Sequence, residues 1–131
     1  MQRTVVNPWS WSVAMGYNQG EVVEGAERVL FCAGQTAVDE NGAPRHAGDM
    51  AAQISLALDN VEAVLREAGM GLTNVIRLNI YTTDVDGFFA VYESAATRLA
   101  SVGVAPPGTL LGVARLAFPE LMVELEATAV A

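Results

Sequence analysis

The stretch from Gly108 to Val130 constrains the fold of this chain most, because its last ten residues alternate in polarity. From Leu121 onward, every second residue is apolar. A period of two places these residues on one face of a β-strand, which we expect to pack on the core. The opposite face carries two carboxylates among apolar neighbours. We expect Glu126 to be solvated, whereas Glu124 is either a rim carboxylate or a candidate functional group.

The length and composition indicate one domain with more apolar residues than the core of one subunit needs. The chain has 131 residues, of which 52% are hydrophobic. No apolar run reaches the roughly 18 residues of a membrane span, and the first residues lack the pattern of a secretory signal. We therefore expect a single domain over residues 1–131, located in the cytoplasm, with its surplus apolar surface in a subunit interface.

The charged and reactive residues exclude several function classes. Seven basic residues, all arginine, face fifteen acidic ones, and the net charge of -8 argues against a nucleic-acid partner. A chain without lysine forms no Schiff base and anchors no pyridoxal phosphate. A lone cysteine, Cys32, excludes an internal disulfide and fits a reducing compartment. The one histidine, His46, excludes a His-rich metal site and is expected on a surface loop.

The clearest helix predicted by the sequence runs from Asp49 to Ala68. Its apolar residues recur at spacings of three and four from Ile54 onward, while Gln53 lies off this stripe. Asp49 is a suitable N-cap. A second helix is expected to begin after Asp84 or Asp86 and to end near residue 99.

The remaining periodic segments predict strands in a β-β-α-β-α-β-β order. The expected strands are Glu21–Val23, Arg28–Cys32, Asn74–Thr83, Thr109–Ala114 and Leu121–Val130. The first two are expected to form a hairpin, as are the last two, and Arg28–Cys32 should be buried on both faces. Residues 1–20 have no lasting period and are expected to fold over the core or a neighbouring subunit. The result is a two-layer α+β subunit whose open sheet face is covered by other subunits.

Three segments carry a resemblance to a known family. They are DMAAQISLALDNVEAVLREAG, GLTNVIRLNIYTTDVDGF and GVARLAFPELMVELEATAV. They resemble the RidA/YjgF family of reactive-intermediate deaminases, also called L-PSP endoribonucleases, and the likeness runs from about Tyr17 to Val130. The resemblance implies a chorismate-mutase-like α+β subunit and a homotrimer with clefts between subunits. In the deaminating branch it also implies hydrolysis of enamines or imines to a keto acid and ammonia, without metal or cofactor.

Three positions match residues of the family's site. The tyrosine of its G-P-Y-x-Q-G segment matches Tyr17 in GYNQG, although the preceding proline is absent. A glycine whose backbone lines the cleft matches Gly34, and a glutamate early in the last strand matches Glu124. The resemblance implies that Glu124 orients water and passes protons, and that Tyr17 hydrogen-bonds the substrate nitrogen or the water.

One departure from the family pattern concerns substrate choice. Aligning VARL places Gly108 where the family has an arginine that clamps the substrate carboxylate. A family cysteine two residues later becomes Leu110, and an asparagine of the second helix becomes Tyr92. Small 2-imino acids are therefore disfavoured. We expect the site to bind a neutral or more apolar small molecule. Gly108, Leu110 and Tyr92 would line this site, and the backbone of Thr109 would help to position the ligand.

Three functions stay open at this stage. The first is a cofactor-independent hydrolase of a reactive imine or enamine. The second is a small-molecule-binding or regulatory trimer without turnover. Gly108 and Leu110, which replace two polar residues of the family, favour this function. The third is a pathway-specific catalyst, such as a deaminase of an aromatic-ring breakdown product. Ribonuclease activity is disfavoured, because an acidic chain with one histidine lacks the acid–base pair and phosphate contacts.

Overall fold

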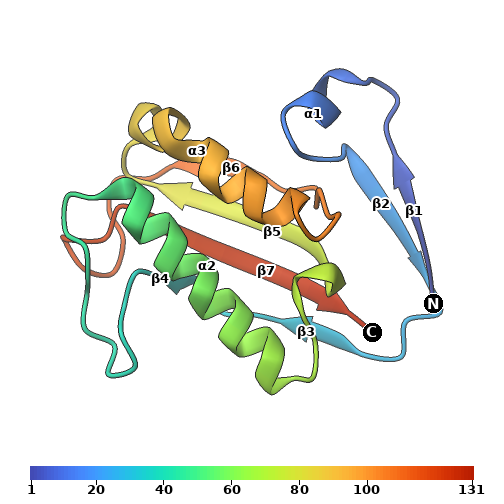
Figure 1. Ribbon diagram of the computed structural model, residues 1–131, viewed down its shortest axis with the longest axis horizontal. Coiled ribbons are helices and arrows are strands. Elements are labelled where there is room, and N and C mark those ends of the chain that lie inside the picture. Colours follow the sequence, from blue (N-terminus) through green and yellow to red (C-terminus); the bar gives the residue numbers. More distant parts are fainter.

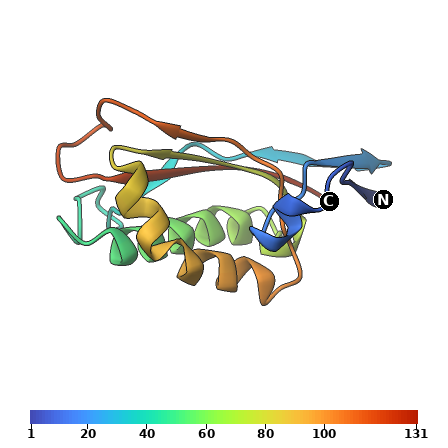
Figure 2. The same ribbon diagram turned by 90° about the horizontal axis from the view of Figure 1, so that it is seen from above.

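Two helices cover one face of a five-stranded sheet in the computed structural model, which describes residues 1–131 (Figures 1 and 2). The strands lie in the order β3–β7–β5–β6, and β4 also pairs with β7. Their bounds are β3 Val29–Phe31, β4 Gln35–Thr36, β5 Val75–Thr82, β6 Leu110–Gly112 and β7 Val123–Val130. Figure 2 shows both helices on the same side of the sheet, so the predicted two-layer α+β architecture is confirmed.

The alternation that predicted the last strand matches the observed burial of β7. Its core-facing residues are at most 3% exposed; they are Val123, Leu125, Ala127 and Ala129. The carboxylates of Glu124 and Glu126 lie on the opposite face, where both residues are half-buried. β7 pairs antiparallel with β3, β4 and β5, and it therefore forms the centre of the sheet.

Both long helices begin at the predicted caps. In α2 (Met50–Glu67) the Asp49 carboxylate accepts from Ala52 N at 3.0 Å, and in α3 (Val85–Ala100) Asp84 accepts from Gly87 N at 3.0 Å. The predicted apolar stripe of α2 is buried against the sheet. Gln53, predicted off this stripe, is also buried, because its amide satisfies three backbone groups at His46, Glu120 and Met122.

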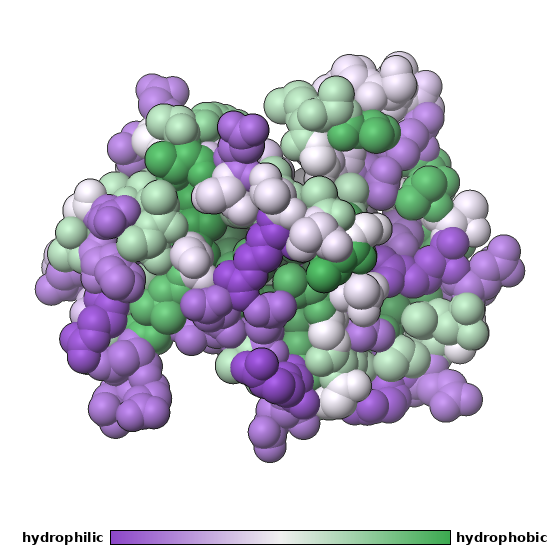
Figure 3. Space-filling model, in the orientation of Figure 1, coloured by the Kyte–Doolittle hydropathy of each residue, from purple (hydrophilic) through white to green (hydrophobic).

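An N-terminal arm, residues 1–24, forms a separate unit beside the sheet. β1 (Gln2–Val6) and β2 (Gly20–Glu24) pair with each other, and the short helix α1 (Trp11–Ala14) joins them. The Arg3 guanidinium donates to the carbonyls of Thr73 and Val75, at the start of β5. Exposed apolar side chains gather on the arm, which forms the upper right of Figure 3.

The predicted hairpin between Glu21–Val23 and Arg28–Cys32 is wrong. β2 takes β1 as its partner instead, and the chain turns away at Gly25, whose φ is +72°. The outer edge of β3 consequently lacks a partner in the chain. The expectation that this strand is buried on both faces is also wrong, since Phe31 is 78% exposed on the uncovered sheet face.

The predicted C-terminal hairpin is wrong as well. β6 pairs in parallel with β5, on the side away from β7. The helix α3 joins β5 to β6, and such a crossover suits parallel strands. The chain then crosses to β7 through residues 113–122, where a small cluster of Ala37, Leu116 and Leu121 buries the connection. A 3-10 turn, η1 (Leu72–Asn74), precedes β5.

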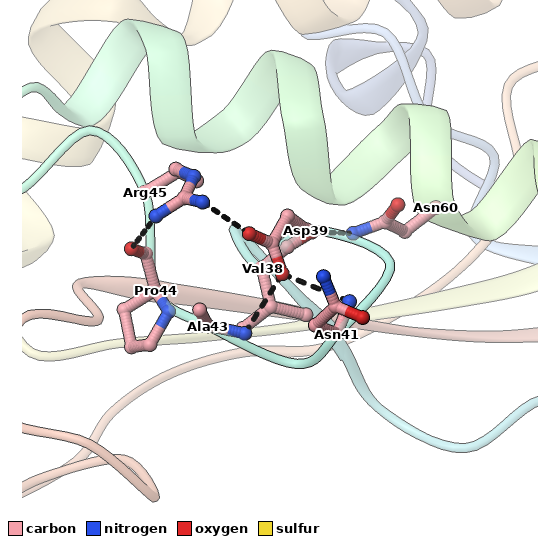
Figure 4. Close-up of polar contacts among 7 residues, drawn as sticks. All are labelled: Val38, Asp39, Asn41, Ala43, Pro44, Arg45 and Asn60. Carbon is pink, nitrogen blue, oxygen red and sulfur yellow. Dashed lines mark hydrogen bonds and ion pairs between the residues drawn. The ribbon is translucent and has the colours of Figure 1, made fainter.

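The loop between β4 and α2 is held by its own polar groups (Figure 4). The Asp39 carboxylate accepts from Asn41 N at 2.9 Å and Ala43 N at 3.0 Å, and it pairs with Arg45. These contacts, led by the bond from Ala43, hold the Asp39 pKa below its ordinary value. The chain turns at Asn41-Gly42, where the φ of Gly42 is +76°, and His46 is exposed as expected.

Candidate functional site

A pocket of about 210 Å³ lies between the two long helices, the sheet and the arm. Seventeen residues line it, thirteen of them hydrophobic, and none is charged. The deep wall includes Ile54, Leu58 and Leu125, which are at most 3% exposed. The arm contributes Met15 to Tyr17 on the outer side. The pocket is therefore apolar at depth, and its polar side chains are those of Tyr17, Tyr92 and Thr109.

Two tyrosines supply side-chain hydroxyl groups to this pocket. The Tyr92 hydroxyl lies 3.5 Å from the backbone oxygen of Met15, which ties α3 to the arm. The Tyr17 ring packs edge-on against Trp11, with centroids 6.1 Å apart. Burial, and to a lesser degree the nearby Tyr17, raise the pKa of Tyr92. Tyr92 is therefore a neutral hydroxyl near neutral pH, able to donate one hydrogen bond.

Gly108 is held so tightly that it leaves no room for a side chain. A Cβ built on this residue would lie 1.8 Å from the carbonyl oxygen of Leu78. The approach follows from local pairing, because Leu78 N donates to Pro107 O at 3.1 Å and Ile80 N donates to Thr109 O at 2.8 Å. Gly108, the position expected from the sequence to match the family's arginine, is thus closed by backbone and does not merely lack a side chain.

Glu124 and Gly34 lie on the other face of the sheet. A Cβ at Gly34 would lie 1.8 Å from Glu124 Oε1, so the carboxylate is seated directly over the glycine backbone. The missing side chain at Gly34 therefore leaves room for the Glu124 side chain to approach the backbone closely. Glu124 is half-buried and has no hydrogen-bond or ion-pair partner within the chain. Its carboxylate is free to meet a ligand or a water.

Glu126, expected to be merely solvated, is instead the centre of a polar cluster. Its Oε1 accepts from Asn79 Nδ2 at 2.9 Å and from the Tyr81 hydroxyl at 3.1 Å. Asn79 Oδ1 in turn accepts from Thr109 N at 3.1 Å, which links the cluster to the pocket wall. The bond to Glu126 is the main reason that the pKa of Tyr81 is raised. Asn79 lies directly opposite Glu126 in the register, so the alternation of both strands was the signal for this contact.

The sequence-predicted residues thus fall into two groups. The first lines the pocket on the helical side and consists of Tyr17, Tyr92, Gly108, Thr109 and Leu110. The second, Glu124 and Gly34, lies across the sheet. One chain does not bring Tyr17 and Glu124 together. No group of three or more His, Cys, Asp or Glu side chains is placed to hold a metal ion, and no helix is long and apolar enough to cross a membrane.

Comparison with known proteins agrees with this geometry. The sequence profile of the family described as Endoribonuclease L-PSP matches residues 10–131. The structure of YyfB, a Rid family protein from Yersinia pestis, is 32% identical with a TM-score of 0.89, and each chain is covered in full. TdcF from Escherichia coli, solved with bound serine, is 29% identical with a TM-score of 0.71, covering 88% of this chain and 87% of that one.

A named enzyme is among the relatives. The 2-iminobutanoate/2-iminopropanoate deaminase of Rattus norvegicus is 29% identical over 92 residues, which cover 70% of this chain and 65% of the rat protein. The profile match spans nearly the whole chain, and it agrees with the likeness to YyfB over its full length. The chain therefore belongs to the endoribonuclease L-PSP family, also known as the RidA/YjgF family.

Proposed function

We propose that this protein hydrolyses a reactive imine or enamine, with Glu124 as the acid–base group. The observation that carries the proposal is the Glu124 carboxylate, which is half-buried, seated on Gly34 and without a partner in the chain. A carboxylate in this state can take a proton from water and return it to nitrogen. The rat relative, named as an imine deaminase, supports the reaction class.

The reaction needs only water and proton transfer. Water adds to the carbon of the C=N bond while Glu124 accepts one of its protons, and the nitrogen is protonated, giving a carbinolamine. The C–N bond then breaks, ammonia leaves, and a C=O bond forms. An enamine first takes a proton at carbon and becomes the imine. In this scheme Tyr17 hydrogen-bonds the nitrogen or the water.

We propose a homotrimer in which the two groups of site residues meet at each junction. One copy supplies Glu124 and Gly34 from its open sheet face, and its neighbour supplies Tyr17 and the pocket. Support comes from the apolar side chains left exposed on that face, with Phe31 78% and Leu111 50% exposed. Surfaces of this kind mark protein interfaces. The protein acts in the cytoplasm on a small molecule, without a nucleic-acid or membrane partner.

The test is ammonia release from imines generated in place by a flavin oxidase, with semicarbazide as the competing trap. Wild type should increase ammonia at the expense of the trapped product, and Glu124→Gln should abolish the increase. Glu126→Gln is the matched control, because it changes the neighbouring carboxylate on the same strand face and should retain most of the rate. Unchanged hydrolysis by Glu124→Gln contradicts the assigned role.

A second candidate is a binding or regulatory protein of the same fold that performs no turnover. The specific observation in its favour is the pocket, which has no charged side chain and whose arginine position is closed by the Leu78 carbonyl. TdcF, a relative solved with bound serine, shows that a member of the family can hold a small molecule. Ligand-induced thermal stabilisation without product formation would distinguish this function from the first.

A further inference from the structure

We propose that the pocket between α2, α3 and the sheet binds a neutral molecule the size of one or two fused aromatic rings. Its volume of about 210 Å³ is the first argument. An apolar cavity of about 150 Å³ lined by Leu, Ile and Phe stays dry and accepts benzene. A pocket moderately larger and similarly lined accommodates indole or a ring with a short substituent. This inference rests on the proposed function, since it names the class of its substrate. The predicted binding can be tested even if the protein catalyses no reaction.

The residues that line the pocket disfavour a ligand with a negatively charged group. No charged side chain lines the pocket, and a buried carboxylate without a cationic or hydrogen-bonding partner is strongly unfavourable. No larger residue can replace Gly108 unless the Leu78 carbonyl moves. Arg77 of β5 is exposed on the open face of the sheet, where its guanidinium donates to Thr109 Oγ1 at 3.5 Å. The geometry therefore selects for neutral over carboxylate-bearing ligands of equal size.

The pocket also has a direction. Its inner wall is formed by Ile54, Leu58 and Leu125 from the buried core. Its arm side holds the Tyr92 hydroxyl, next to the backbone of Met15 and Gly16. A ligand with an apolar ring and one polar group would therefore place the ring inward and the polar group against Tyr92. Such an orientation leaves the reactive end of an aryl-substituted imine on the outer side, where the neighbouring copy would meet it.

The test measures binding alone, by calorimetry and thermal shift on the intact protein. Indole is the neutral probe, and indole-3-acetate is its carboxylate-bearing counterpart. Indole should bind wild type with a dissociation constant at or below about 1 mM and raise the melting temperature by a few degrees. Indole-3-acetate should bind at least about tenfold more weakly.

A filled pocket provides the decisive comparison. Ala95→Phe places a ring inside the pocket from α3, and Ala90→Phe makes the same change at an exposed position of that helix. Ala95→Phe should lose indole binding at least about tenfold, while Ala90→Phe should retain it. If Ala95→Phe does not fold, Ala95→Leu fills part of the same space and should weaken binding by a smaller factor.

Three outcomes overturn the inference: no indole binding to wild type, equal binding by Ala95→Phe, or equal binding of indole-3-acetate. None of these bears on the role of Glu124, which is judged from imine hydrolysis. Conversely, indole binding with no hydrolysis of any imine would leave the pocket assignment standing and remove the proposed reaction. The failure of one proposal is therefore distinguishable from the failure of the other.

Discussion

Two glycines offer a matched test of how the site residues are held. A Cβ on either Gly34 or Gly108 would approach an oxygen atom to 1.8 Å, and neither glycine has a positive φ. The atoms approached differ in kind. At Gly108 it is the carbonyl oxygen of Leu78, fixed in the sheet, whereas at Gly34 it is the carboxylate end of Glu124, a flexible side chain. The same substitution, glycine to alanine, should therefore have opposite consequences.

Gly108→Ala should destabilise the fold substantially. Cβ atoms essentially never come within 3.0 Å of such a neighbour, so the segment at Gly108 must move roughly 1.2 Å farther from the Leu78 carbonyl of β5. Overpacking of this kind costs about 1–3 kcal/mol, and weakening a backbone hydrogen bond between residues 78 and 107 adds about 0.5–1.5 kcal/mol. We expect a loss of roughly 1.5–4.5 kcal/mol in unfolding free energy, or about 6–18 °C in melting temperature.

Gly34→Ala should instead preserve stability and remove activity. The Glu124 side chain can rotate away at a cost of about 0.5–1.5 kcal/mol, which is offset by about 0.4–1 kcal/mol from the lower entropy of the unfolded alanine chain. The net change in unfolding free energy should stay within about 1 kcal/mol. The carboxylate is then displaced from its seat, so the imine-hydrolysis rate should fall toward that of Glu124→Gln.

Denaturant unfolding at one protein concentration measures both stabilities, since an oligomer makes them concentration-dependent. The double variant Gly34→Ala/Glu124→Ala completes a thermodynamic cycle, and it should recover any stability lost by Gly34→Ala alone. The reasoning is refuted if Gly108→Ala loses less than about 1 kcal/mol, or if Gly34→Ala loses as much as Gly108→Ala does.

Three further predictions concern the junction, the tyrosine cluster and the cysteine. Mixing Glu124→Gln chains with Tyr17→Phe chains, each inactive alone, and refolding them together should restore about a quarter of wild-type hydrolysis, because a junction needs one intact residue from each copy; no recovery would place both residues in one chain's site. In an ultraviolet titration, Tyr81 should ionise above its ordinary pKa of 10.0, and Glu126→Gln should lower that step. Since the folded pKa is raised, Tyr81 contributes stability below about pH 10 that is lost as pH rises through the folded value; a step unmoved in Glu126→Gln would contradict the pairing. Burial raises the pKa of Cys32, so Ellman's reagent should react slowly with the native protein and fast in denaturant, and equal rates would count against the buried position.

The helices and the central strand were predictable because each carries its own periodic signal. The caps at Asp49 and Asp84 are local contacts over three residues, and the alternation of β7 reports burial on one face directly. Strand pairing is different, because a hydrophobic pattern identifies a strand without naming its partner. Both predicted hairpins joined strands that are adjacent in sequence. The structure instead pairs β2 with the unpredicted β1, and β6 with β5 in parallel.

The contacts of the buried polar residues could not be predicted from the sequence, for a related reason. Gln53 follows no apolar period, yet it is fully buried because three distant backbone groups converge on its amide. Glu126 was judged by its own strand alone, whereas Asn79 and Tyr81 reach it from the neighbouring strand. Such contacts depend on register, and register could be assigned only after β5 and β7 were known to be neighbours.

The separation of the candidate site into two groups follows from the same period of two that revealed β7. Leu125 faces the helices and lines the pocket, so Glu124, one residue earlier, must face the other way. Any residue that lines the helical pocket, Tyr17 included, is therefore kept from Glu124 by the thickness of the sheet. No rotamer change within one chain crosses that barrier. Catalysis that uses both residues consequently requires a second copy, whose arm and pocket meet the open face of the first. A monomer can bind a ligand in its pocket but cannot bring its own Glu124 to that ligand.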